Sequence, residues 1–143
     1  MTSPQRAIEH LLLVTSASRA MLQLRRDDGS FAIAAEAVQH GQRQIRNTQR
    51  EDDAAVLDIS GLAAGSQHIL QDTPHAPGPD AVTARLRAPL VRAGGLAGVI
   101  SLHLCGPARD WTSEDRDALE GARTAVLACL DAGSRTEEEL RSA

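Results

Sequence analysis

A set of polar side chains at alternate positions of predicted strands has the chemistry to bind a small molecule. Successive residues of a strand point to opposite faces of a sheet, so Ser101 and His103 share one face. Arg87 and Gln23 fall on that same side of their own predicted strands, among apolar neighbours. A few polar groups within an apolar rim are typical of a ligand pocket. The candidate ligand-binding residues are Met21, Gln23, Glu36, Arg87, Ser101 and His103.

The residue types on this face favour a small anion as the ligand. The guanidinium of Arg87 can bind a carboxylate or a phosphate through two parallel hydrogen bonds. Ser101 and His103 would add donors, and we expect His103 to contribute positive charge at mildly acidic pH. In the alternative interpretation an acid, such as Asp72 or Glu36, neutralises Arg87 as a structural pair.

Catalytic chemistry has little support in the sequence. There is no glycine-rich loop of the phosphate-binding type. No Cys-x-x-Cys or His-x-x-x-His pair marks a metal site, and Cys105 and Cys129 show no metal-ligand spacing. We expect both cysteines to be reduced, packed thiols. The sequence therefore predicts no catalytic residue and no metal ligand, and it names no cofactor.

The stretch that positions most of these residues is a predicted hairpin followed by a helix. Two apolar runs flank Gly94-Gly95, which can adopt the positive φ of a tight turn. After a short loop, Thr112 can cap a helix by accepting from the backbone N–H of Asp115, which can answer from the third helical position. The order of this stretch is strand, turn, strand, helix.

The other predicted elements follow from capping residues and periodicity. Ser3 and Pro4 favour a helix that ends near residues 15–17, and Gly133 is a plausible cap for a final amphipathic helix. Between these helices the sequence predicts strands at 20–25, 31–38 and 67–71, turns or loops at 27–30 and 72–80, a helix at about 51–63 and a helical turn at 79–84.

The chain resembles the GAF domain family. The resemblance rests on Ala88-Pro89-Leu90, Gly98-Val99-Ile100-Ser101-Leu102 and Trp111-Thr112-Ser113-Glu114-Asp115, in this order, and covers about residues 4–132. It implies an α+β, profilin- or PAS-like fold with a central antiparallel sheet of five or six strands. The terminal helices would cover one face, and the pocket segment 42–84 the other. From its composition, we expect the polar segment 133–143 to be a partly disordered C-terminal tail, with a second helical turn from Thr136 as the alternative.

Composition excludes two classes of partner. The chain has 143 residues, the length of one domain, with a net charge of −4 and no lysine. That charge argues against nucleic-acid binding, and two aromatic residues, Phe31 and Trp111, are too few to stack single strands. The apolar run 11–14 is far too short to span a membrane and lacks the flanks of a signal peptide. We expect a cytoplasmic protein.

The resemblance implies a sensor or regulatory module, and because the residues give catalysis little support, we expect that it is not an enzyme. In this family the second face of the sheet binds ligands such as cyclic nucleotides, tetrapyrroles or metabolites. Since no output domain has room in the sequence, a stand-alone domain would signal through a homodimer or a separate output protein. Leu11, Leu12 and Leu13 spread apolar surface beyond one helix face, which favours a dimer through the terminal helices. Two alternatives remain, a thiol-dependent reductase of the methionine sulfoxide type and a pocketless dimeric scaffold.

Overall fold

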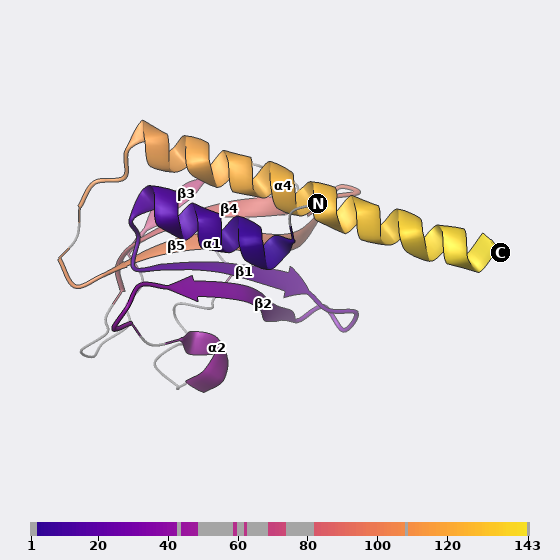
Figure 1. The fold of residues 1–143 in the computed structure, drawn as a ribbon, viewed down its shortest axis with the longest axis horizontal. Helices are drawn as coiled ribbons and strands as arrows, with labels where there is room; N and C mark the ends of the chain where they lie inside the picture. The colour runs from indigo at the N-terminus through magenta and orange to yellow at the C-terminus, as the bar shows by residue number, and fades with distance from the viewer. Residues whose placement is uncertain are drawn as a thin grey trace.

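The fold is α+β, with one antiparallel sheet and two long helices (Figure 1). The computed structural model describes residues 3–42, 44–48, 59, 62, 69–73, 82–107 and 109–142. Within these residues five strands lie in the order β2-β1-β5-β4-β3, and every neighbouring pair is antiparallel. The elements are α1 (Pro4–Thr15), β1 (Arg19–Arg25), β2 (Phe31–Val38), α2 (Ile45–Thr48), β3 (Leu70–Asp72), β4 (Val82–Arg92), β5 (Gly95–Cys105) and α4 (Ser113–Ser142).

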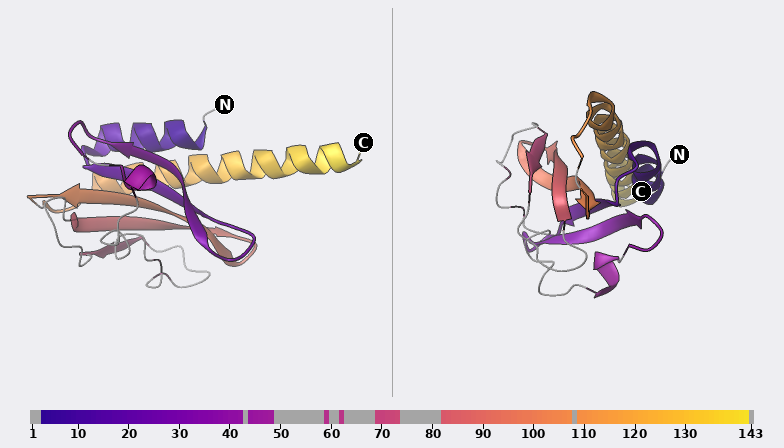
Figure 2. Two further views of the ribbon diagram at one scale, coloured as in Figure 1. Left: turned by 90° about the horizontal axis from the view of Figure 1, so that it is seen from below. Right: turned by 90° about the vertical axis from the view of Figure 1, so that its left-hand side faces the viewer.

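The two long helices lie side by side over one face of the sheet, and α2 lies at the other face (Figures 1 and 2). The core between helices and sheet is built mainly from aliphatic residues. Leu102 of β5 is paired with Ala20 of β1 and with Leu86 of β4, and all three belong to this core. Ile8 and Leu119 are among the helix residues that pack on it. These apolar residues alternate along their strands with the polar ones, as the predicted alternation requires, and lie on the face that the helices cover.

Local capping explains where α1 begins and ends. The Ser3 hydroxyl accepts a hydrogen bond from the backbone N–H of Arg6 at 3.2 Å, and Pro4 stands at the first helical position. Ser16 adopts a left-handed conformation with φ 55° and donates its N–H to Leu12, at 3.1 Å. The predicted helix near 4–15 is therefore confirmed, and the strands predicted at 20–25 and 31–38 correspond to β1 and β2.

The β4–β5 hairpin turns one residue earlier than the sequence predicts. Arg92 pairs with Gly95, so Ala93 and Gly94 are the two turn residues, with φ 52° and 78°. Both angles are positive, as a two-residue turn that matches the twist of the strands requires. Gly95 is instead the first residue of β5. The second glycine of the pair therefore does not form the turn, and an alanine takes the left-handed position.

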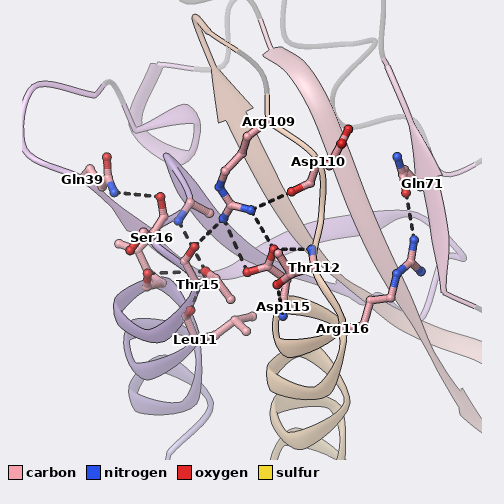
Figure 3. A network of polar contacts seen from close by, with 12 residues as sticks. Leu11, Thr15, Ser16, Gln39, Gln71, Arg109, Asp110, Thr112, Asp115 and Arg116 are labelled. Carbon is pink, nitrogen blue, oxygen red and sulfur yellow. Dashed lines mark hydrogen bonds and ion pairs between the residues drawn. The ribbon is translucent and has the colours of Figure 1, made fainter.

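A polar junction ties the end of α1 to the beginning of α4 (Figure 3). The guanidinium of Arg109 donates to the Thr15 carbonyl at 2.6 Å and to the Asp115 carboxylate at 2.7 Å. The predicted capping box is confirmed, since the N–H of Thr112 donates to Asp115 and the N–H of Asp115 donates to the Thr112 hydroxyl. Arg109 also lies over the ring of Trp111, 5.3 Å from its centroid, and Trp111 is buried in the core.

Three further predictions differ from the structure or lie outside it. The helix expected at 51–63 falls on residues of which only Ile59 and Leu62 are described, so it cannot be compared. The helical turn expected at 79–84 is wrong over 82–84, where β4 begins, because these residues pair with β5. The short strand expected at 67–71 is found as β3, at 70–72. The short helix α2 has no counterpart among the predicted elements.

The final helix does not end at Gly133. It continues without a break to Ser142, so the polar segment 133–143, expected to be a partly disordered tail, is helical as far as Ser142. This part of α4 extends beyond the ends of the strands (Figure 1). A glycine disfavours the interior of a helix by only about 1 kcal/mol, which neighbouring helix-forming residues can offset.

We expect Gly98→Ala to destabilise the fold. A Cβ at Gly98 would lie 2.6 Å from the backbone oxygen of Gln23 and 2.9 Å from Leu24 Cδ2, so β1 would have to shift. Overpacking of this kind costs about 1–3 kcal/mol of unfolding free energy. Gly133→Ala is the matched control, because nothing lies within 4 Å of its added Cβ and α4 should gain about 0.5–1 kcal/mol. Urea denaturation measures both, and a neutral Gly98→Ala would contradict the close approach of β1 and β5.

Candidate functional site

The predicted polar residues lie together on the sheet face turned away from α1 and α4. They form adjacent rows across the three central strands, because register places residues of β1, β5 and β4 side by side. One row contains Met21, Ser101 and Arg87, and the next contains Arg19, His103 and Arg85. Glu36 of β2 is paired with Met21, and Gln23 is paired with Val99.

All six predicted site residues are buried. Ser101 and His103 have exposed fractions of 1% and 0%, and Glu36, which the sequence alone could have placed in solvent, has 4%. A buried charged or polar group is costly unless it is hydrogen-bonded or paired. The partners of each group therefore decide what the site can bind.

The carboxylate of Glu36 fixes α2 against the sheet. Its Oε2 accepts from the backbone N–H of Ile45 at 2.9 Å, and its Oε1 accepts from the N–H of Arg46 at 3.1 Å. Arg19 Nε lies 3.2 Å from the same Oε2. Ile45 in turn packs against Val82, in a small second core. Glu36 is thus a positioning residue, and its carboxylate is already occupied by protein groups.

The contact between Arg19 and His103 determines which imidazole nitrogen carries the proton. Arg19 Nη1 lies 3.2 Å from His103 Nδ1, and a guanidinium can only donate. Nδ1 is therefore the acceptor, and Nε2 carries the hydrogen of the neutral ring. Burial, reinforced by the guanidiniums of Arg19, Arg85 and Arg87, holds the pKa of His103 well below its usual value. The expectation that His103 gains charge at mildly acidic pH is therefore corrected, since the ring is neutral there.

Asp72 of β3 faces the two arginines of β4. Arg85 donates to its carboxylate twice, at 2.8 and 2.6 Å, and Arg87 Nη2 lies 3.2 Å from Asp72 Oδ2. The hydrogen bonds from Arg85, followed by its charge and that of Arg87, lower the pKa of Asp72 although burial opposes the shift. The structure thus contains the pairing of Arg87 with Asp72 that the alternative interpretation proposed. Arg87 keeps its predicted place on the face, and its charge has a carboxylate beside it.

Two polar atoms at the centre of this face have no hydrogen-bond partner in the part of the chain that the structure describes. They are Ser101 Oγ and His103 Nε2, both fully enclosed. Burying such a group without a partner costs about 1–3 kcal/mol. Such atoms are unusual in native proteins, and a bound water, ion or ligand is one way in which their hydrogen bonds are completed.

Arg19 is a site residue that was not predicted from the sequence. The predicted strand began at residue 20, whereas β1 begins at Arg19. Extending the alternation of Gln23 and Met21 by one step would have placed Arg19 on the same face. Arg85 stands two residues before Arg87, so alternation places it on the same face, but only the position of β3 shows that it shares Asp72 with Arg87.

The structure also records concave surfaces away from this face. A groove of about 640 Å³ runs between α1 and α4, lined on α4 by Ala118, Gly121, Ala122 and Ala125. Val14, with an exposed fraction of 52%, lines it on α1. Within the described residues no cluster of three or more His, Cys, Asp or Glu could hold a metal ion. None of the described helices is both long and apolar enough to cross a bilayer.

The lowered pKa of His103 makes a prediction about stability. Below about pH 6.5 the unfolded chain binds a proton on this residue and the folded chain does not. The unfolding free energy therefore falls by up to ~1.4 kcal/mol for each unit by which the pH is lowered. In His103→Gln this part of the slope should disappear, while His10→Gln, at an exposed position of α1, should retain it. Urea denaturation between about pH 7 and pH 5 measures the slope. An unchanged slope in His103→Gln would show that the buried ring is not the titrating group.

Comparisons with known proteins identify the family. The GAF domain model matches residues 5–130. Among solved structures, the blue-light absorbing form of the PixJ GAF domain from Thermosynechococcus elongatus superposes with a TM-score of 0.68 at 20% identity, covering 97% of this chain and 91% of that one. The photoproduct state of a GAF domain from Synechocystis has a TM-score of 0.67 at 16% identity, covering 90% and 94%.

A third similar structure is a domain of a protein assigned as a two-component sensor histidine kinase from Sinorhizobium meliloti. Its TM-score is 0.66 at 17% identity, and the match covers 93% of this chain and 92% of that one. No curated protein matches the sequence. The family match spans most of the chain, and the solved GAF domains share its fold. This chain belongs to the GAF domain family.

Proposed function

We propose that this GAF domain is a sensor, which binds a small molecule on the polar sheet face and passes its occupied state to a second copy or a separate output protein. The observation that carries the proposal is the pair of enclosed atoms, Ser101 Oγ and His103 Nε2, which lack hydrogen-bond partners within the described residues. A bound molecule would complete them. The sensory role of similar GAF-fold proteins, such as the assigned histidine kinase, supports the same conclusion.

A small anionic metabolite is the ligand class that the charges favour. The guanidiniums of Arg19, Arg85 and Arg87 disfavour added positive charge at His103, and the same electrostatic condition favours a negative group there. Because Asp72 forms ion pairs with Arg85 and Arg87, Arg87 would act on the ligand through its charge at longer range rather than through direct paired hydrogen bonds.

We propose binding rather than catalysis as the activity. A thiol-dependent reductase would need cysteines that can react with one another, whereas Cys105 of β5 packs beside Ile45 and Val82, and Cys129 belongs to α4, over the other face of the sheet. A methionine sulfoxide reductase assay, with Cys105→Ser and Cys129→Ser as controls, decides between these functions. We do not propose a chromophore for this chain by analogy with the similar GAF domains, because identities of 16 and 20% indicate a shared fold only.

Ligand binding can be tested without knowing the ligand. Native mass spectrometry of the purified protein should find a bound mass, or a thermal-shift screen of metabolites should find a compound that raises the melting temperature. A ligand at a hundred times its Kd adds about 2.7 kcal/mol to the unfolding free energy. His103→Gln should reduce the shift and His10→Gln should not. A protein with no bound mass and no stabilising compound would instead be the pocketless scaffold.

We also propose a homodimer through α1 and α4. Leu13 has an exposed fraction of 79% on α1, and Val14 borders the apolar groove between the helices. Exposed apolar surface of this kind is typical of an interface. Sedimentation at tens of micromolar should show a dimer. The double variant Leu13→Asp, Val14→Asp places charge in the proposed interface and should be monomeric. His40→Asp, an exposed change in the loop after β2, should not. A monomeric wild-type protein would contradict the interface.

A further inference from the structure

The two enclosed atoms lie on one strand, two residues apart. Ser101 and His103 both point to the polar face of β5, the central strand, where each has neighbours on both sides. Alternate residues of a strand are separated by about 6.6–6.8 Å, so both groups can reach one small molecule. Ser101 Oγ and His103 Nε2 find no hydrogen-bond partner within the described residues.

The His103 nitrogen is a donor. Arg19 has no acceptor atom, so its contact with Nδ1 at 3.2 Å requires that Nδ1 accept. The proton of the neutral ring is then on Nε2, so the atom that has no partner within the described residues is an N–H donor. The Ser101 hydroxyl can rotate to donate as well. An atom that satisfies both groups at once must accept hydrogen bonds.

The surroundings select among acceptors. Three guanidiniums, those of Arg19, Arg85 and Arg87, act on His103, and they oppose positive charge at this point. A ligand ammonium group would meet an N–H donor and these guanidiniums, and both interactions are unfavourable. A carboxylate or carbonyl oxygen carries negative charge, which is favourable both beside the N–H donor and near the guanidiniums.

We propose that Ser101 and His103 bind a carboxylate or carbonyl oxygen of the ligand, through the Ser101 hydroxyl and the Nε2–H of His103. This assignment rests on the proposed ligand-binding function and specifies the atoms that recognise the ligand. Arg19 is a positioning residue, because it holds the imidazole in the tautomer that donates. Glu36 supports Arg19 from β2, at 3.2 Å from its Nε.

The assignment makes an unusual prediction for the unliganded protein. Ser101→Ala removes a buried hydroxyl that has no partner, so the melting temperature should stay unchanged or rise. Ser18→Ala is the matched control, because the Ser18 hydroxyl is also buried but accepts from the backbone N–H of Cys105 at 2.9 Å. Its loss should lower the melting temperature by about 3 °C or more. An equal loss in Ser101→Ala would mean that its hydroxyl has a structural partner, and would overturn the assignment.

Recognition itself is tested with three probes of similar size: acetate, acetamide and methylammonium. In ¹⁵N NMR spectra of the imidazole, His103 should show its proton on Nε2, and acetate or acetamide should shift that resonance. Methylammonium at matched ionic strength should not. Ser101→Ala should weaken the effective probe about tenfold, the loss expected for one hydrogen bond. A proton on Nδ1, a response to methylammonium alone, or no response to any probe would overturn the assignment.

The comparison of acetate with acetamide distinguishes a carboxylate ligand from a neutral carbonyl ligand. Failure here can be separated from failure of the proposed function. A compound found by native mass spectrometry that has no carboxylate or carbonyl oxygen would overturn the acceptor assignment and leave the sensor function intact. The sensor function itself fails only if the purified protein carries no bound mass and no screened metabolite stabilises it.

Discussion

The polar face of the sheet depends on one buried guanidinium, that of Arg19. An enclosed positive charge is tolerated only when it is paired and hydrogen-bonded. Arg19 lies between the carboxylate of Glu36 and the imidazole of His103, and so joins β2, β1 and β5. Glu36 in turn accepts from the first backbone N–H groups of α2. The need to pair this charge thus positions α2 and selects the tautomer of His103.

The same part of the sheet is bonded to the segment that leaves α1. The N–H of Ser18 donates to the carbonyl of His103, and the N–H of Cys105 donates to the Ser18 hydroxyl, both at 2.9 Å. Only Ser16 and Ala17 separate Ser18 from Thr15, whose carbonyl is held by Arg109 at the start of α4. The candidate site is therefore connected to the ends of both long helices through hydrogen bonds and a few residues of chain, and α1 and α4 are the helices on which the proposed dimer depends.

Elements with strong local signals were predicted well. The cap at Ser3, the capping box of Thr112 and Asp115, and the alternation in β4 and β5 all appear as the sequence indicates. Each depends on contacts within a few residues or on a period of two. The turn at Ala93 and the continuation of α4 through Gly133 were not predicted, because a single glycine permits a turn or a helix end without requiring it.

The sequence by itself determined which side chains share the polar face and that an aliphatic face lies under the helices, because alternation is a property of each strand alone. Only the tertiary structure decided what those polar groups do. Asp72, which lies beside Arg87, and Glu36, which lies beside Arg19, are separated from these arginines by 15 and 17 residues, and strand order brings them together. Burial then made His103 neutral and left it a donor. Burial and long-range pairing depend on how strands assemble, which no local pattern encodes.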